Sequence, residues 1–318
     1  MLKGWLYFPI FFFSGMITCI LNFFWILHQE QRSSPEEKKP PRFAPKNKKR
    51  IPSFLSLAFS NSYEGIETVA EGGMGIVLSG WDRERMRKVA IKTILPELMG
   101  NQEAVKLFLH ECQVIQSFNH PNIVRIFEVG QKNFLYYVME YLDGETVEDI
   151  MNREKCLPVE LAVKIGTQVS RALNYLHSTG LVHRDIKPSN LFLIRNDVVK
   201  LIDFGVIKLL SSGEKAPSSS SAGSFLYASP EQIQSEEIMG KSDVYSLGIC
   251  LFYMLTGKLP FSENDPMARI FGEYKKIQEL NPNLSAPLVN LIESCLKPAP
   301  VNRISAHELW IRLRAMTG

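Results

Sequence analysis

The hydrophobic pattern of this chain changes near Gly144, and that change constrains its fold more than any other feature. From Tyr63 onward, short runs rich in β-branched and aromatic residues alternate with Gly and Asn, which is typical of antiparallel strands. The strand-like runs are 68–78, 89–94, 123–129 and 136–141, with one helical stretch at 102–118. After Gly144 longer helical patterns follow. We therefore predict an α+β chain with a small β-rich lobe followed by a larger helical lobe.

Two stretches of the second half illustrate the helical pattern. Apolar residues recur every three or four positions over 161–176, and Gly180 then ends the predicted helix. The stretch 245–255 is apolar on all sides, which predicts a helix buried inside the lobe.

An uncharged apolar stretch of 24 residues, 4–27, precedes these lobes. As a helix it would extend about 36 Å, enough to cross a hydrocarbon core of about 30 Å. The leading interpretation is a retained transmembrane helix over residues 1–28. The alternative is a cleaved signal peptide, which would need a shorter apolar core and a small-residue cleavage site. We find no good cleavage site in this stretch.

The basic charge of the chain is concentrated near its N-terminus. Residues 1–62 hold nine Lys/Arg against three Asp/Glu, a net charge of +6, whereas residues 63–318 hold 27 against 30, or −3. Only Lys3 precedes the apolar stretch, so the positive-inside rule predicts a single-pass protein of the cell membrane with everything after residue 28 in the cytoplasm. Because the folded part is mildly acidic, a nucleic-acid partner is not expected.

Residues 29–62 are rich in Pro and Lys and are predicted to be a basic juxtamembrane linker that lies near anionic lipid. The apolar segment Ile51–Phe59 at its end could pack on the following domain or on the bilayer, and the sequence does not decide between them. Five dispersed cysteines without a CxxC pair predict reduced, buried thiols rather than a disulfide framework or a zinc site.

A glycine-rich segment, E-G-G-M-G-I-V at 71–77, joins two strand-like runs. Closely spaced glycines let a backbone approach phosphate oxygens, although such a segment alone is more often just a tight turn. The following V-A-I-K at 89–92 places Lys92 in an apolar strand, where an unpaired ammonium group would be costly. Glu111, on the helical stretch, is its candidate partner.

Two further motifs bring acidic and amide side chains together, H-R-D-I-K-P-S-N at 183–190 and D-F-G at 203–205. The oxygens of Asp185, Asn190 and Asp203 suit Mg²⁺, which prefers hard ligands. Asp185 could also accept a proton from an attacking hydroxyl group.

In this order and spacing, the motifs resemble the signature set of protein kinases. The G-G-M-G loop, H-P-N at 120–122 and S-P-E-Q at 229–232 are similar to the bacterial eukaryotic-like (Hanks-type) serine/threonine kinases. The resemblance covers 63–317 and implies a two-lobed kinase fold, with an N-lobe at 63–142 and a C-lobe at 143–317. It implies transfer of the γ-phosphoryl group of Mg-ATP to Ser or Thr hydroxyls of protein substrates.

The resemblance also implies a role for each motif residue. Asp185 would orient the substrate hydroxyl and accept its proton, and Lys187 would neutralise the transferred phosphoryl group. Lys92 would hold the α- and β-phosphates while pairing with Glu111. Asn190 and Asp203 would hold the magnesium ions. The residues expected around ATP are Val69, Ala70, Gly72, Gly73, Gly75, Val77, Ala90, Lys92, Met139, Glu140, Leu142 and Phe192.

Supporting residues follow from the same resemblance. Glu231 should pair with Arg303, and Asp243 should anchor the catalytic loop. A stacked hydrophobic spine is expected at Ile115, Ile126, His183 and Phe204. The chain departs from the family pattern at Ala70, which replaces the first loop glycine and should raise the KM for ATP, and at Phe192, a bulky adenine floor.

The activation segment, 203–231, contains eight serines. Lys187 and Ser224 favour a Ser/Thr acceptor. The phosphosite candidates are Ser218, Ser219, Ser220, Ser221 and Ser224, and our hypothesis is autophosphorylation within 218–221 that orders the loop. Arg184 and Lys208 resemble the cations that bind such a phosphate.

Two alternatives stay open from the sequence. A pseudokinase would bind nucleotide and serve as a membrane scaffold, and only Ala70 favours it. A small-molecule phosphotransferase would lack the S-P-E motif and the pairing of Glu231 with Arg303. The expected partners are protein substrates and the lipid bilayer, and a homodimer is left open.

Overall fold

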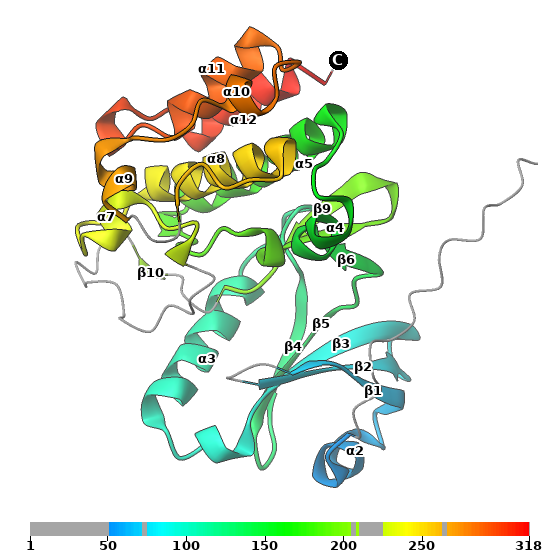
Figure 1. Ribbon diagram of the computed structural model, residues 1–318. Helices are drawn as coiled ribbons and strands as arrows, with labels where there is room; N and C mark the ends of the chain where they lie inside the picture. The colour runs from blue at the N-terminus through cyan, green and yellow to red at the C-terminus, as the bar shows by residue number, and fades with distance from the viewer. Residues whose placement is uncertain (1–50, 72–74, 205–207, 210–224, 263–265, 318) are drawn as a thin grey trace, which may run out of the picture. The chain divides into compact units, whose positions relative to one another are not determined.

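The computed structural model describes residues 51–71, 75–204, 208–209, 225–262 and 266–317 (Figure 1). The predicted transmembrane helix over 1–28, the linker up to residue 50, and the expected site residues Gly72, Gly73, Ser218, Ser219, Ser220, Ser221 and Ser224 lie outside the described residues. No helix in the described part of the chain is long and apolar enough to cross a membrane.

The first lobe is built on one five-stranded sheet with the order β1-β2-β3-β5-β4. Every neighbouring pair in this sheet is antiparallel, as the alternating runs predicted. The run 68–78 is not one strand, because it holds the end of β1 and the start of β2. The strands are β1 (Tyr63–Glu71), β2 (Gly75–Asp82), β3 (Arg87–Ile94), β4 (Ile126–Gln131) and β5 (Leu135–Glu140). Helix α3 (Gln102–Gln116) begins at Asn101, whose side chain accepts hydrogen bonds from two backbone N–H groups of the first turn.

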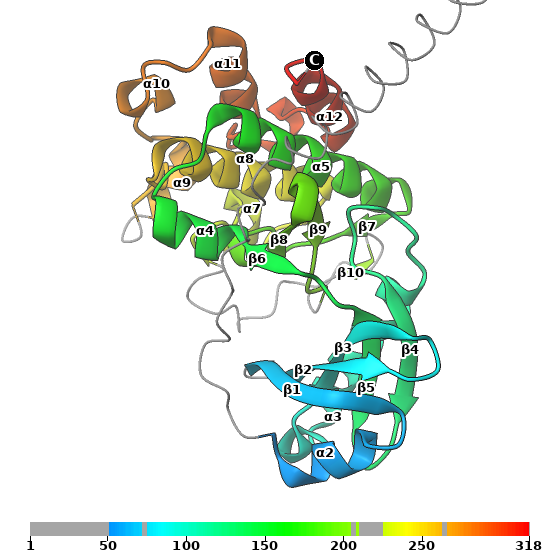
Figure 2. The ribbon, with the colours of Figure 1, turned by 90° about the vertical axis from the view of Figure 1, so that its right-hand side faces the viewer.

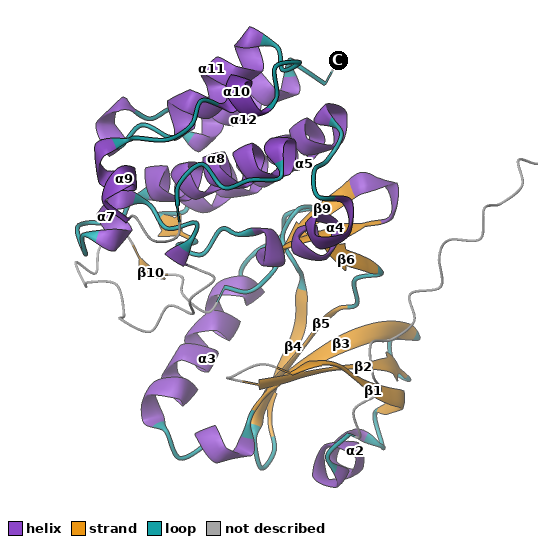
Figure 3. Ribbon diagram, viewed as in Figure 1, coloured by secondary structure: helices purple, strands orange, loops and turns teal. Residues whose placement is uncertain are grey.

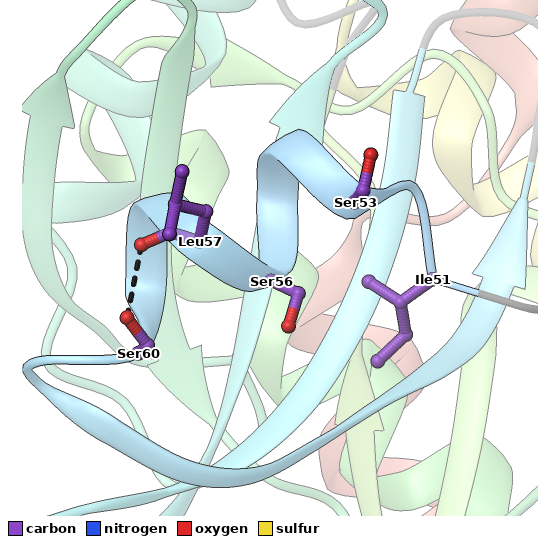
Figure 4. Close-up of a pocket in the computed structure, with 5 residues that line it drawn as sticks. All are labelled: Ile51, Ser53, Ser56, Leu57 and Ser60. Atoms are coloured by element: carbon purple, nitrogen blue, oxygen red, sulfur yellow. Dashed lines mark hydrogen bonds between the residues drawn. The ribbon is translucent and has the colours of Figure 1, made fainter.

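A short helix, α2 (Ser53–Phe59), packs on this sheet within the stretch that the sequence assigned to the linker. Leu55 and Phe59 are buried, and the Phe59 ring meets those of Tyr63, Phe134 and Tyr136 edge to face. Of the two surfaces considered for Ile51–Phe59, the structure therefore shows packing on the domain. Its opposite face borders a shallow surface hollow formed by Ile51, Ser53, Ser56, Leu57 and Ser60 (Figure 4).

The second lobe is mainly helical (Figure 3). Its helices are α4 (Val147–Glu154), α5 (Val159–Ser178), α7 (Pro230–Ile233), α8 (Gly240–Thr256), α9 (Pro266–Phe271), α10 (Ile277–Leu280), α11 (Ala286–Cys295) and α12 (Ala306–Arg314), with the 3₁₀ turns η2 (Pro188–Asn190), η3 (Arg195–Asp197) and η4 (Pro300–Asn302). Thirteen of the 17 residues of α8 are buried, which confirms the predicted interior helix. Gly180 follows α5 with φ 77°, a conformation that few other residues adopt.

Short strands join the two lobes and carry the site (Figure 2). They are β6 (Gly144–Thr146), β7 (Leu181–Val182), β8 (Leu191–Ile194), β9 (Val198–Leu201) and β10 (Lys208–Leu209). Leu201 donates its N–H to the Asn122 carbonyl (2.8 Å) and accepts from the N–H of Val124 (3.0 Å). These bonds tie β9 to the segment before β4. The predicted two-lobed α+β architecture is therefore confirmed.

Candidate active site

The loop at 183–190 is fixed by hydrogen bonds to Asp243, a buried carboxylate on α8. Asp243 accepts hydrogen bonds from the backbone N–H groups of His183 (2.9 Å) and Arg184 (2.8 Å), and it lies 2.8 Å from Nε2 of His177. Burial alone would raise the pKa of Asp243, but these hydrogen bonds and the histidine charges outweigh it and lower that pKa. Asp243 therefore stays ionised and anchors the loop, as expected.

Asp185 stands at the centre of this loop with two partners from the same motif. Lys187 Nζ lies 2.8 Å from Oδ2 of Asp185, and the Asn190 amide donates to the same oxygen at 3.0 Å. The Asn190 amide also donates to the Asp185 carbonyl at 2.8 Å. The 183–190 motif thus forms a compact cluster in which a carboxylate is oriented by a cation and an amide.

A second cluster reaches the site from the first lobe. Lys92 on β3 lies 2.8 Å from Oε1 of Glu111 on α3 and 3.7 Å from Oδ1 of Asp203. The Tyr137 hydroxyl donates to the same Glu111 oxygen at 3.0 Å. Burial alone would lower the pKa of Lys92, but the surrounding Tyr137, Glu111 and Asp203 groups raise it well above its ordinary value. The ammonium group is therefore charged, and the predicted pairing with Glu111 is confirmed.

Asp203 has a strained backbone conformation and precedes the buried residue Phe204. Its φ is 63°, in the left-handed region that residues with a side chain rarely adopt. The following Phe204 is fully buried, and its ring lies 4.8 Å from that of His183. Ile115 and Ile126, the other expected spine residues, are also buried.

Asn190 and Asp203 are brought together by the backbone. The N–H of Ile202 donates to the Asn190 carbonyl at 3.0 Å, which sets the Asp203 strand end beside η2. Among the described residues, no group of three or more His, Cys, Asp or Glu side chains could hold a metal ion. One carboxylate and one amide oxygen nevertheless fit Mg²⁺, which usually binds one or two carboxylates and takes its other ligands from phosphates and water.

The described residues that are expected around the nucleotide lie on strands of the sheet and on segments at the lobe junction. Val69 on β1 is 55% exposed, Val77 on β2 is half-buried, and Ala90 on β3 pairs with Met139 on β5. Gly75 is required at its position, because a Cβ there would lie 2.1 Å from the Thr93 carbonyl oxygen. The remaining described members, Leu142 and Phe192, are half-buried at the lobe junction.

Ala70 lies beside an irregularity in β1. The pairing of β1 with β2 shifts register between Thr68 and Ala70, and Ala70 pairs with Val77. Ala70 does not adopt a positive φ, so its backbone accommodates the methyl group without strain. The structure therefore gives no local reason for the chain to need glycine at this position.

An ion pair between Lys200 and Glu140 lies at the lobe junction and was not predicted from the sequence. Lys200 Nζ on β9 lies 2.6 Å from Oε1 of Glu140, and the same oxygen accepts the Arg125 N–H at 2.9 Å. The alternation of β9 turns Lys200 away from its buried neighbours Val199 and Leu201, which was the available signal. The partner could not be read from the sequence.

A second buried ion pair braces the segment that follows the activation segment. Both terminal nitrogens of Arg303 bond Glu231, at 2.6 and 2.7 Å, as expected. On the same short helix α7, the Gln232 amide donates to the Arg184 carbonyl at 2.9 Å, which ties α7 to the catalytic loop. Arg269, for which the sequence carries no signal, is buried and donates to the Phe225 carbonyl.

The comparisons with known proteins agree with this geometry. The family model of the protein kinase domain matches residues 63–311. A probable serine/threonine-protein kinase of Clostridium perfringens is 38% identical over 257 residues, which is 78% of this chain and 37% of that protein. The serine/threonine-protein kinase PrkC of Bacillus subtilis is 33% identical over 259 residues (80% of this chain, 40% of that protein).

A third relative, the serine/threonine-protein kinase PknB of Mycobacterium tuberculosis, is 32% identical over 256 residues (77% of this chain, 41% of that protein). The chain thus spans about two-fifths of the length of these relatives. On its motifs, its two lobes and these relatives, the chain belongs to the protein kinase family and is similar to the bacterial, Hanks-type serine/threonine kinases.

Proposed function

We propose that this chain is a serine/threonine protein kinase that transfers the γ-phosphoryl group of ATP to hydroxyl groups of protein substrates. The observation that carries the proposal is the convergence of two clusters. Asp185 lies with Lys187 and Asn190 in one cluster, and the other joins Lys92 to Glu111 and Asp203. Together they supply a base, two cations and two oxygen ligands in one place.

Each cluster has a chemical task. Asp185, oriented by its two neighbours, accepts a hydrogen bond from the substrate hydroxyl and takes its proton as the new P–O bond forms, while the bond between the γ-phosphorus and the bridging oxygen breaks and ADP leaves. Lys187 Nζ, 2.8 Å from that carboxylate, neutralises charge on the transferred group. Lys92, fixed by Glu111, orients the α- and β-phosphates. Mg²⁺, when held by Asn190 and Asp203, neutralises phosphate charge.

The competing reading is a pseudokinase scaffold that binds nucleotide without transferring phosphate. The described site retains the base, both cations and the oxygen ligands, and the backbone at Ala70 is unstrained. These features favour the active enzyme over the scaffold.

Three further properties are part of the proposal. We infer that the kinase is anchored in the cell membrane by a single helix within 1–28, because that stretch is apolar and basic residues follow it. We also infer that it phosphorylates its own activation segment within 218–221, where four serines are adjacent. Association into a homodimer would bring one activation segment to the site of a second copy.

The test is phosphoryl transfer by the full chain in detergent, beside its Asp203→Asn variant. Both proteins are incubated with radiolabelled ATP, Mg²⁺ and a generic basic protein. Label on Ser or Thr with the wild type alone supports the kinase. A wild type that binds nucleotide, measured by calorimetry, yet transfers no label would contradict it and favour the scaffold. Mapping of self-labelled serines tests the activation-segment proposal.

A further inference from the structure

Tyr137 on β5 lies beside the candidate active site but belongs to none of the sequence motifs that define it. It pairs across the sheet with Lys92 on β3, so the two side chains share the face of the sheet that lies toward α3. Tyr137 is only 2% exposed. A hydroxyl group buried this deeply needs a hydrogen-bond partner, and that partner indicates what the residue does.

Tyr137 contacts α3 at two points. Its hydroxyl group donates to Oε1 of Glu111 at 3.0 Å, and its ring centroid lies 5.5 Å from that of Phe108. Phe108 and Glu111 are three positions apart, so they lie on one face of the helix in neighbouring turns. Tyr137 thus joins β5 to α3 through both a hydrogen bond and a ring contact.

The hydroxyl group of Tyr137 acts as a donor. Burial and the nearby carboxylates of Glu111 and Asp203 raise the pKa of this hydroxyl well above its ordinary value, although the charge of Lys92 opposes them. The hydroxyl is therefore protonated. The hydrogen bond that it donates to a carboxylate is stronger than one between neutral groups.

The carboxylate that Tyr137 engages is the one that fixes Lys92. Oε1 of Glu111 accepts from both side chains, since Lys92 Nζ lies 2.8 Å from it, and Glu111 is only 4% exposed. The ammonium group of Lys92 has three hydrogens, and those not used by Glu111 can bond phosphate oxygens. A second donor on Oε1 stabilises Glu111 in this position while Lys92 serves a nucleotide.

We propose that Tyr137 is a positioning residue for phosphoryl transfer, a latch between β5 and α3 that holds Glu111 where it fixes Lys92. Its ring sets the distance between the strand and the helix, and its hydroxyl group sets the orientation of the carboxylate. This inference rests on the proposed kinase function and adds a third side chain to the pair formed by Lys92 and Glu111.

The neighbouring Tyr136 provides a matched control. Successive residues of a strand face opposite sides of the sheet, and the ring of Tyr136 meets Phe59 of α2 instead of α3. Its hydroxyl group also donates to a carboxylate, that of Glu128, at 3.3 Å. Tyr136→Phe therefore removes the same atom and the same kind of hydrogen bond, but on the other face of β5.

The first test is steady-state phosphoryl transfer by the full chain in detergent. Tyr137→Phe keeps the ring but loses the hydroxyl group, and it should lower kcat about tenfold without changing the KM for the protein substrate. Tyr136→Phe should keep the wild-type kcat. In a Glu111→Ala background, Tyr137→Phe should change kcat by less than about twofold, because the hydroxyl group acts through that carboxylate. An unchanged kcat in Tyr137→Phe, or a tenfold loss that persists without Glu111, would overturn the proposal.

Hydrogen exchange separates the latch from the kinase activity. Measured by mass spectrometry on the same proteins, amide exchange over α3 should be about threefold faster in Tyr137→Phe than in the wild type or Tyr136→Phe. If the wild type transfers no phosphate but this difference appears, the kinase proposal fails and the latch holds. If α3 exchanges at the same rate in all three proteins, the latch is overturned whatever the activity.

Discussion

The most informative single change is the replacement of Arg303 by Met. Arg303 forms an ion pair with Glu231, and both side chains are buried, with exposed fractions of 0% for Arg303 and 2% for Glu231. Arg303 also donates to the carbonyl oxygens of Lys297 (2.6 Å) and Pro298, and its guanidinium group lies 4.7 Å from the Tyr245 ring centroid. Methionine fills much of this volume but leaves the Glu231 carboxylate buried without its cation.

The size of the expected loss of stability follows from the Glu231 carboxylate, which stays buried without a cation. Breaking one partner of a buried pair destabilises a protein by about 3–5 kcal/mol, because the remaining charge is uncompensated. For a domain of this size, each kcal/mol lowers the Tm by about 2–4 °C. We therefore expect Arg303→Met to lower the Tm by about 6–20 °C at pH 8, measured by circular dichroism of the full chain in detergent.

The pH dependence of this loss gives a sharper test. Burial would raise the pKa of Glu231, but the hydrogen bonds and charge of Arg303 outweigh it and lower that pKa. A lowered pKa contributes stability above the unfolded value of about 4.3, and this contribution is lost as the pH falls below it. In Arg303→Met burial is opposed only by the Ser242 hydrogen bond and a backbone hydrogen bond, so the Glu231 pKa rises. The difference in Tm between wild type and variant should therefore shrink from pH 8 to pH 4.5.

Two variants control for this reasoning. Adding Glu231→Gln to Arg303→Met removes the orphaned charge and should restore part of the lost Tm. Arg312→Met removes an exposed pair with Glu308, 56% and 42% exposed, and should change stability by less than about 1 kcal/mol. A deficit that is the same at pH 8 and pH 4.5, with no recovery in the double variant, would refute the argument.

The remaining predictions concern the candidate active site and helix α2. Lys92→Met should lower kcat at least about 100-fold in steady-state phosphoryl transfer, and an unchanged kcat would exclude its role. Ala70→Gly should lower the KM for ATP about two- to fivefold, since glycine frees the loop backbone, and an equal or higher KM would contradict this. Phe59→Ala should destabilise the protein by about 3–5 kcal/mol in urea unfolding, whereas a loss below 1 kcal/mol would mean that α2 contributes little.

How much of this site could be predicted depends on how each residue is held. Asp185, Lys187 and Asn190 lie within six positions of one another, so the spacing of one motif already brings them together. Lys92 and Glu111 are 19 positions apart, yet a cation in an apolar strand requires an acid and the next helix offers one. In both cases the contacts could be predicted from residues that are close in the sequence or from the need of a buried charge for a partner.

The features that were missed depend on tertiary contacts alone. Helix α2 has seven residues, too few for a recognisable period or for stability on its own, and the rings that Phe59 meets determine its place. Arg269 donates to a backbone carbonyl and lies against aromatic rings, and such contacts carry no signature in the sequence. The Lys200 partner, Glu140, is 60 positions away at the lobe junction. No local rule connects such residues before the lobes are assembled.

His120 gives a last prediction, which links the junction of the lobes to pH. Its Nδ1 accepts the N–H of Asn122 at 3.1 Å, and its ring stacks on Tyr175 at 5.2 Å. Burial, together with the nearby charges of Arg171 and Lys200, lowers the pKa of His120 to about 4.

The unfolded chain, with a histidine pKa of about 6.5, therefore binds more protons than the folded chain between pH 6.5 and pH 4, so stability falls as the pH falls through this range. For a shift of this size the loss between pH 7 and pH 5 is about 2 kcal/mol. His120→Gln keeps a hydrogen-bond acceptor but cannot be protonated. Its free energy of unfolding, from urea titrations at the two pH values, should fall by about 2 kcal/mol less than that of the wild type. Equal losses in both proteins would mean that His120 takes up its proton over the same pH range in the folded and the unfolded chain, and that the junction tolerates a third cation beside Arg171 and Lys200.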